Sequence, residues 1–249
     1  MVGNNFGPID KNSPVPLYFQ INDILLKKIK AEEFKTHQQI PTEEELTATF
    51  QVSRMTVRQA ISKMVTEGIL YRKRGHGTFV AEPKLERKVA KLTSATVDME
   101  EAGLKPGAII LHKKIMTPNE EERNILGLRP KEHVLEILRL RLANDQPIAI
   151  GRAVIPLKKY PDLVQANLDG VVSLTQYMEQ NCGCRIAYAD QKIKAMNANA
   201  QQARLLKIKK GTSVVHLNRV IFDYDRDPIG IFESFYRGDR YVFTSTLYK

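Results

Sequence analysis

The sequence predicts an α+β protein with two domains: a helical amino-terminal domain and a larger carboxyl-terminal domain built on an antiparallel sheet. Apolar residues recur at helical spacing in three segments between residues 17 and 67. From residue 108 onward, alternating runs bounded by turn residues predominate, with short helical segments between them. The chain has 249 residues, which is enough for two domains of ordinary size.

Three helices are expected in the first 68 residues. The first runs from about Leu17 to Phe34, after the stiff segment Pro14-Val15-Pro16. The second opens at Thr42, which has the capping-box spacing to Glu45. The third follows Ser53, an N-cap residue, and carries an apolar stripe of Val57, Ile61, Met64 and Val65.

A basic hairpin should follow the third helix. Two short runs, Ile69–Arg74 and Thr78–Val80, are joined by Gly75-His76-Gly77. Between residues 51 and 80 there are six Lys and Arg residues against one acid, Glu67. Three helices and then a hairpin is the order of a winged helix-turn-helix, which presents its third helix to DNA. The alternative is an ordinary amphipathic helix and hairpin whose charges are solvated.

Composition narrows the class of protein further. The formal net charge of +10 favours a polyanionic partner. No apolar run approaches the roughly eighteen residues of a membrane span, and no secretory signal heads the chain, so we expect a cytoplasmic protein without a membrane partner. Cys182 and Cys184 are expected to be free thiols. The five histidines are scattered without metal spacing, and we expect no metal and no cofactor.

Residues 81–92 are charged and lack an apolar period, which predicts a linker between domains at 1–80 and 93–249. In the second domain the expected helices are Thr96–Ala102, a helix begun by Thr117-Pro118, Leu174–Gln180 and Ala200–Leu206. The expected strands are Ala108–Met116, Val134–Ala143, Ile148–Ile155, Ile186–Lys194, Ser213–Tyr224 and Ile229–Tyr236. Hairpins with helices laid on them indicate an antiparallel sheet.

Four motifs in the first domain carry a family resemblance: PLYFQI, PTEEEL, VSRMTVRQAISKMVTEGIL and GHGTFV. Over residues 14–80 they resemble the DNA-binding domain of GntR-family bacterial transcription regulators. The resemblance implies that the third helix enters the major groove and the glycine-tipped wing approaches the minor groove. The implied DNA-binding residues are Ser53, Arg54, Thr56, Arg58, Gln59, Arg74, Gly75, His76, Gly77 and Thr78. Glu44 stands where the family has an operator-reading arginine, so the operator sequence stays open.

The second half resembles the effector domain of the HutC subfamily, which has a chorismate-lyase-like fold. The motifs that carry this likeness are LTSATVDMEEAG, ILRLRLANDQPIAI and FYRGDRYVF. The chain is most similar to the subfamily's regulators that respond to amino-sugar phosphates. The resemblance also implies a homodimer joined mainly through this domain.

Arg139 and Arg141 are two residues apart on one predicted strand, so they share a face and could grip a phosphate or carboxylate together. The alternative is an exposed arginine ladder. The family's positions imply that Thr96, Arg139, Arg141, Ser173 and Tyr236 bind the effector.

Two departures leave the effector's identity open. Gly151 and Gly230 stand where the family often has glutamates, and Glu233 is expected on the opposite strand face. An anionic group, as in a sugar phosphate, is the better supported feature of the effector.

These observations predict a homodimeric, ligand-responsive regulator that binds a palindromic double-stranded operator and is released by a small anionic metabolite. Most members of this family are repressors, and such a protein associates with the nucleoid when bound. One alternative is a DNA-tethered enzyme acting on a small anionic metabolite, although no catalytic residue stands out. Another is an architectural DNA-binding protein without a ligand pocket.

Overall fold

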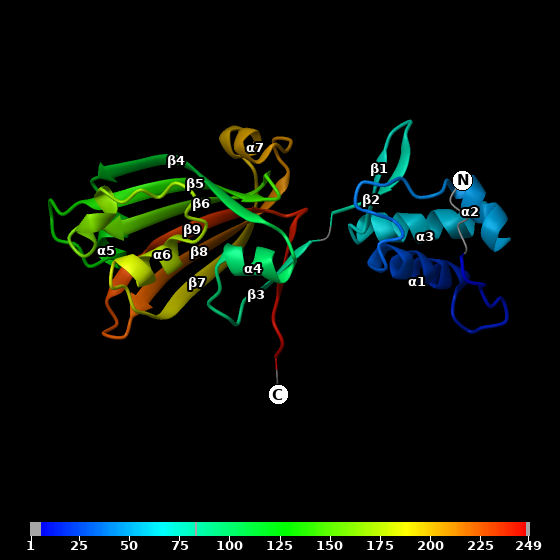
Figure 1. Ribbon diagram of the computed structural model, residues 1–249, viewed down its shortest axis with the longest axis horizontal. Coiled ribbons are helices and arrows are strands. Elements are labelled where there is room, and N and C mark those ends of the chain that lie inside the picture. Colours follow the sequence, from blue (N-terminus) through cyan, green and yellow to red (C-terminus); the bar gives the residue numbers. More distant parts are fainter. Residues whose placement is uncertain (1–5, 83, 248–249) are drawn as a thin grey trace. The chain divides into compact units, whose positions relative to one another are not determined.

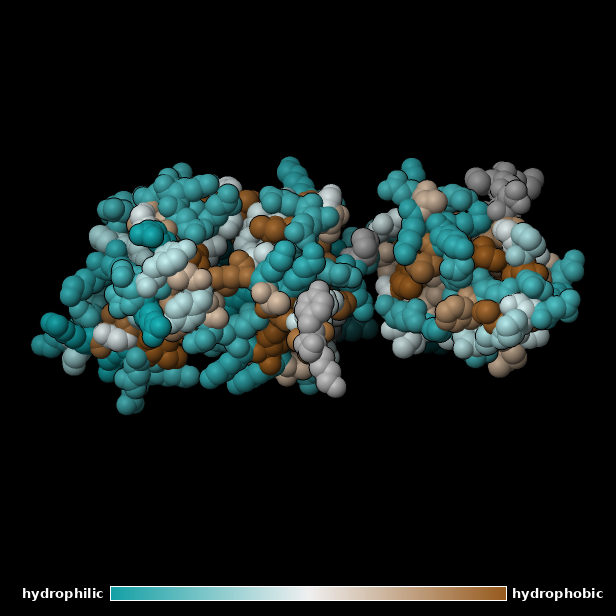
Figure 2. All heavy atoms as spheres, turned by 90° about the horizontal axis from the view of Figure 1, so that it is seen from below, coloured by the Kyte–Doolittle hydropathy of each residue, from teal (hydrophilic) through white to brown (hydrophobic). Residues whose placement is uncertain are grey.

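The computed structural model describes residues 6–82 and 84–247. The chain divides into two compact units, Met1–Lys84 and Leu85–Lys249 (Figure 1). The first is helical with a small hairpin and the second contains a six-stranded sheet, so the α+β prediction is confirmed. Most of the surface seen in Figure 2 is hydrophilic, and apolar side chains are confined to separate patches.

The first unit has the predicted order of three helices and a hairpin. Its elements are α1 (Leu17–Lys30), α2 (Glu43–Phe50), α3 (Arg54–Thr66), β1 (Leu70–Lys73) and β2 (Gly77–Val80). The predicted apolar faces meet in one core that includes Ile21, Leu25, Leu46, Phe50, Val57, Ile61 and Met64. Thr42 and Glu45 form the predicted capping box at the start of α2.

Helix α1 is shorter than predicted. It ends at Lys30 instead of Phe34, because Glu32 adopts a positive φ of 58° that a helix cannot continue through. Phe34 is nevertheless buried in the core, which explains why the apolar pattern ran past the end of the helix.

The hairpin gains a third partner that the sequence pattern did not reveal. Gln39 bridges to Phe79 of β2, and the backbone N–H of Ile40 donates to the carbonyl of Thr78 at 3.0 Å. Gly77 has a φ of 116°, and a Cβ added there would lie 2.4 Å from the Gln39 side-chain nitrogen. The position therefore requires glycine for both its backbone conformation and its close neighbour.

The second unit is organised by an antiparallel sheet in the order β4-β5-β6-β9-β8-β7. These strands are β4 (Pro106–Met116), β5 (Val134–Ala143), β6 (Gln146–Pro156), β7 (Ile186–Asn197), β8 (Ser213–Asp223) and β9 (Pro228–Arg237). The predicted turn at Asn144-Asp145 has positive φ at both residues, as a tight hairpin of this hand requires. All six strands were predicted, with ends that differ by a few residues.

Helices cover both faces of this sheet. They are α4 (Ala95–Glu101), α5 (Glu120–Ile125), α6 (Leu174–Asn181) and α7 (Ala200–Leu206), together with the 3-10 helix η1 (Pro161–Val164). Residues of α4 and α6 pack with the face that includes Ile137 and Tyr236, whereas α7 packs on Leu140 and Ile150 of the other face. Helix α5 is capped by Asn119 and Glu122, two residues later than the predicted cap at Thr117.

Part of the predicted linker is wrong. Residues Leu85–Lys88 form strand β3, which pairs in parallel with β10 (Tyr241–Thr244) near the other end of the chain. Leu85 and Arg87 alternate inward and are fully or almost fully buried. The sequence predicts a linker here because β3 is only four residues long and its partner strand, β10, lies far away in sequence.

Candidate DNA-binding surface and effector pocket

Helix α3 presents a polar, basic surface beside the hairpin. Ser53 caps the helix by accepting from the backbone N–H of Thr56 at 3.2 Å, as predicted. Val57, Ala60, Ile61 and Met64 are buried, which leaves Arg54, Arg58 and Gln59 exposed. An exposed basic face backed by a packed core is the geometry with which a recognition helix enters the major groove.

The hairpin tip is exposed as well. Arg74, Gly75, His76 and Gly77 are exposed and Thr78 is half-buried. The neighbouring Arg72 is less available, because its guanidinium contacts Glu43 of α2 at 3.3 Å and donates to the Ser62 hydroxyl at 3.1 Å. Glu44 is exposed on α2, so its negative charge faces solvent where the family resemblance implies an arginine. Most of the predicted DNA-binding residues are thus exposed on α3 and at the hairpin tip of this unit.

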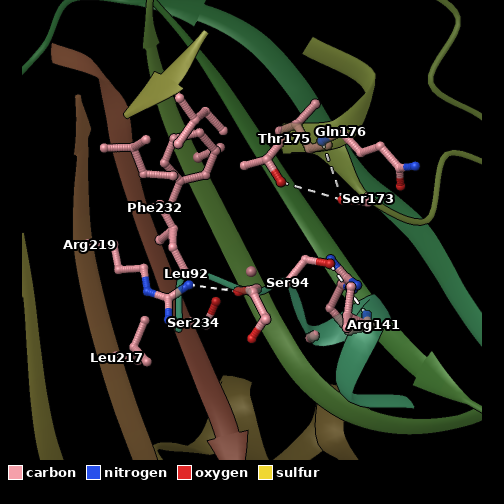
Figure 3. A pocket seen from close by; sticks show the side chains of 18 of the residues that line it. Leu92, Ser94, Arg141, Ser173, Thr175, Gln176, Leu217, Arg219, Phe232 and Ser234 are labelled. Carbon is pink, nitrogen blue, oxygen red and sulfur yellow. Dashed lines mark hydrogen bonds between the residues drawn. The ribbon is translucent and has the colours of Figure 1, made fainter. Parts of the chain in front are cut away.

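The second unit contains a cavity of about 570 Å³ over the sheet face covered by α4 and α6 (Figure 3). Arg139 and Arg141 of β5 lie on its wall and are each 8% exposed, so they do not form an exposed ladder. Arg139 donates to the carbonyl of Val171 at 3.2 Å, and Arg141 donates to the hydroxyl of Thr96 at 2.7 Å. Among the described residues, neither guanidinium forms an ion pair with a carboxylate.

Burial lowers the pKa of both guanidinium groups. Desolvation, with a smaller contribution from Arg141, lowers the pKa of Arg139 to about 9. Desolvation also lowers the pKa of Arg141. Because an arginine guanidinium stays protonated in proteins, the cavity wall holds two positive charges that a bound anion would compensate.

Two further arginines approach the cavity from β3 and β8. Arg87 donates to the Tyr236 hydroxyl at 2.5 Å and to the carbonyl of Thr93 at 2.6 Å, and it pairs with Asp98 at 3.2 Å. Arg219 donates to the same Thr93 carbonyl at 2.9 Å. Burial, with Arg87 next, lowers the pKa of Arg219 to about 10. Burial raises the pKa of Asp98, and the neighbouring Arg87 opposes this shift.

Two helix N-termini also border the cavity. Ser94 caps α4 and Ser173 caps α6, and both serines line the pocket. Helix N-termini present unpaired N–H groups and the positive end of the helix dipole, which favour an anion. The arginines and these serines together give this part of the cavity the positive charge and the N–H donors that an anion needs.

The structure brings together four of the five residues predicted for the effector: Arg139, Arg141, Ser173 and Tyr236 all line the cavity. Thr96 does not. Its hydroxyl donates to the carbonyl of Val172 at 3.0 Å and accepts from Arg141, so it holds Arg141 in place and has no donor left for a ligand. Direct binding of the effector by Thr96 therefore stays a prediction, and in this structure its hydroxyl contacts Val172 and Arg141.

Sequence reasoning missed Arg87, Ser94, Arg219 and Ser234, which also line the cavity. Arg219 had a usable signal, because it alternates with the inward-facing residues Leu217 and Ile221. Arg87 had none, since its burial depends on the pairing of β3 with β10.

The opposite face of the sheet holds a separate ionic cluster around Arg152. Its guanidinium contacts Glu136 and Glu122 at 2.6 Å each and Glu233 at 3.0 Å. The expectation that Glu233 lies on the opposite strand face is confirmed, because it pairs in register with Arg152, whose guanidinium it contacts, whereas Ser234 pairs with Gly151. Burial would raise the pKa of Glu136, but hydrogen bonds from Arg152, His112 and Lys114 lower it to about 2.

Both cysteines are free thiols, as predicted. The described residues include no group of three or more histidine, cysteine, aspartate or glutamate side chains placed to hold a metal ion. No helix within the described ranges is long and apolar enough to cross a membrane.

A basic winged helix in one unit and a cavity lined by buried arginines in the other are the features of a ligand-responsive DNA-binding regulator. Comparison with known proteins places the chain within this class. Residues 17–80 match the family "Bacterial regulatory proteins, gntR family", and residues 101–242 match the UTRA domain. The chain belongs to the GntR family of transcription regulators that carry a UTRA effector domain.

Relatives match over nearly the whole chain. The HTH-type transcriptional repressor NagR of Bacillus subtilis is 37% identical over 94% of this chain and 96% of its own length. The probable fructoselysine utilization operon transcriptional repressor of Escherichia coli is 30% identical over the same two shares. The structure of PhnF from Mycobacterium smegmatis covers 93% of this chain and 98% of its own, with a TM-score of 0.69 and 28% identity.

Proposed function

We propose that the protein is a homodimeric repressor that binds a palindromic operator and leaves it when a small anionic metabolite enters the cavity. The observation that carries this proposal is the pair Arg139 and Arg141, which are buried in a cavity without a carboxylate partner. An uncompensated buried charge is costly, and a phosphate or carboxylate from a ligand removes that cost. Sugar phosphates are the first class to test, because relatives include repressors named for fructoselysine and mannosyl-D-glycerate.

The operator side of the proposal rests on α3 and the hairpin. One recognition helix reads only a few base pairs, so two copies on half-sites about one helical turn or a multiple apart are needed for specificity. We propose Ser53, Arg54, Thr56, Arg58 and Gln59 as the helix contacts. The hairpin contacts are Arg74, Gly75, His76, Gly77 and Thr78.

The competing functions are less well supported. An architectural DNA-binding protein needs no cavity, yet the second unit has one lined by buried arginines. An enzyme needs an acid–base pair near the substrate. Asp98, beside the arginine cluster, is paired with Arg87, and Glu100 and Glu179 of the lining are exposed to solvent. We therefore propose a regulator without catalytic residues that works in the cytoplasm and associates with the nucleoid when bound.

The test is operator release. An operator selected from a randomised duplex library is labelled, and binding of the full chain is followed by fluorescence anisotropy while sugar phosphates and carboxylates are added. We expect at least one anion to release the unmutated protein but not the R139Q variant. If the anions release both chains equally, the cavity is not the effector site.

A further inference from the structure

The cavity wall changes from polar to apolar along strands β6 and β9. Along β6 and β9, three successive pairs face the cavity side of the sheet: Ala149 with Tyr236, Gly151 with Ser234, and Ala153 with Phe232. All of these residues except Ala149 line the cavity. Each step covers two residues, or about 7 Å, so the first and last rows are about 13 Å apart. The first row adjoins Arg141 and Arg87, while the last row has no polar side-chain atom on either strand.

The apolar end is extended by other elements. The lining residues there are Ala153, Leu174, Ile186, Ala187, Ile221 and Phe232. Phe232 and Ile186 are only partly buried although they pack against a core cluster, so they keep apolar surface open to the cavity. Phe232 and Arg141 lie on opposite sides of the cavity in Figure 3.

Gly230 limits the space on the sheet side of Phe232. Gly230 precedes it on the same strand face, and a Cβ there would lie 2.9 Å from the carbonyl oxygen of Val154 and 3.2 Å from the Phe232 ring. A side chain at position 230 would therefore have no room between the Phe232 ring and the sheet. Gly151 differs, because its Cβ would meet nothing closer than a backbone oxygen at 4.0 Å, which leaves open space between the two ends of the cavity.

The polar groups near the apolar end form hydrogen bonds with other protein groups or are exposed to solvent. Arg219 pairs in register with Phe232, but its guanidinium donates to the Thr93 carbonyl that Arg87 also contacts, and to Gln191. Thr175 of α6 also belongs to the lining, but it is half-buried and its hydroxyl is hydrogen-bonded to that of Ser173 at 3.4 Å. Glu100, Gln176 and Glu179 are exposed residues of the lining. A ligand with hydroxyl groups along its whole length would leave them facing apolar side chains, at the cost of their hydrogen bonds to water.

We infer that the effector is amphipathic: an anionic head group bound at the arginines and an apolar ring or chain packed against Phe232. This inference rests on the proposed function and narrows it, because a fully hydroxylated sugar phosphate satisfies only the anionic end. Packing an apolar body on Phe232 removes the remaining open apolar surface of the cavity from water.

The test compares two phosphate monoesters with equal charge, benzyl phosphate and glucose 6-phosphate, by titration calorimetry on the full chain. We expect benzyl phosphate to bind at least about tenfold more tightly, since it buries its ring. Its binding should also show a negative heat-capacity change. Equal or tighter binding of glucose 6-phosphate, or no binding of benzyl phosphate, would overturn the inference.

Variants separate the two ends of the cavity. F232A should weaken the binding of benzyl phosphate about tenfold and the binding of glucose 6-phosphate less than about twofold. Phe235 is the matched control, because it lies on the opposite face of the same strand and stacks on His216, so F235A should change neither affinity. R139Q should weaken both probes alike.

The outcomes distinguish the two proposals. If R139Q weakens both probes while F232A affects them equally or not at all, the anion site stands and the amphipathic effector is refuted. If R139Q changes neither affinity, the proposed anion site itself is wrong.

Discussion

Replacing Arg152 with methionine should destabilise the effector unit strongly. Arg152 contacts three carboxylates, those of Glu122, Glu136 and Glu233, and Met fills a similar volume without charge. Removing one partner of a buried ionic network costs about 3–5 kcal/mol, because the remaining charges are left without compensation. The Arg152 side chain is 23% exposed, so we expect the lower end, about 3 kcal/mol near neutral pH.

The unfolding free energy that R152M loses should become smaller as the pH falls. Contacts lower the pKa of Glu136 from 4.5 to about 2, so in the unmutated chain its contribution is present above pH 4.5 and is lost as the pH falls toward 2. In R152M, Glu136 has lost the hydrogen bond from Arg152 that lowers its pKa, and burial opposes its ionisation. Protonation of Glu136 as the pH falls therefore removes part of the destabilisation that R152M causes. The difference in unfolding free energy between the two chains should therefore shrink between neutral pH and about pH 4.

The assay uses the cysteines, because both lie in the effector unit and Cys184 is buried. Urea unfolding is followed by labelling Cys184 with a dipyridyl disulfide, which reports this unit and not the DNA-binding unit. K158M is the control: Lys158 pairs with Glu132 at the surface with a 75% exposed side chain, so its loss should cost less than about 1 kcal/mol. A cost for R152M no larger than that of K158M, or one that grows as the pH falls, would refute the reasoning.

Three further variants test other parts of the account. R58A should weaken binding to a selected operator by about 1–3 kcal/mol in anisotropy titrations if Arg58 makes a bidentate base contact, while R129A in the other unit should not. G77A should lower the stability of the DNA-binding unit by about 1–3 kcal/mol in hydrogen exchange, because its Cβ meets Gln39, and should cost more than G75A, where the space is open. T96V should leave operator affinity unchanged but weaken anion binding in calorimetry by about 1–3 kcal/mol, because Arg141 loses its hydroxyl acceptor; unchanged anion affinity would show that Thr96 does not position Arg141.

The sequence predicts elements well where local pattern decides them. Strand β5 has the predicted ends, Val134 and Ala143, because alternation along it is regular and an Asn-Asp turn follows. Strand β3 could not be found in this way: it exists because it pairs with β10, about 150 residues later, and its four residues carry no period of their own.

The same limit applies to the site. The shared face of Arg139 and Arg141 follows from strand geometry, but their burial depends on α4 and α6 packing over the sheet. Thr96 is implied as an effector-binding residue by the family's positions alone, and nothing in the neighbouring sequence shows what its hydroxyl contacts. Its actual acceptor, the Val172 carbonyl, is 76 residues away in sequence and only the fold brings them together.

The central claim is that the anion site and the DNA-binding unit are coupled. It is tested most directly by measuring operator affinity with and without a saturating anion, chosen as the tightest-binding phosphate monoester, for the unmutated chain and for the double variant R139A/R141A. The account predicts that the anion weakens operator binding of the unmutated chain by about 1–3 kcal/mol, or roughly 5–150-fold, and that operator weakens anion binding by the same factor. The double variant should bind operator normally and ignore the anion. Equal operator affinity of the unmutated chain with and without the bound anion would contradict the account.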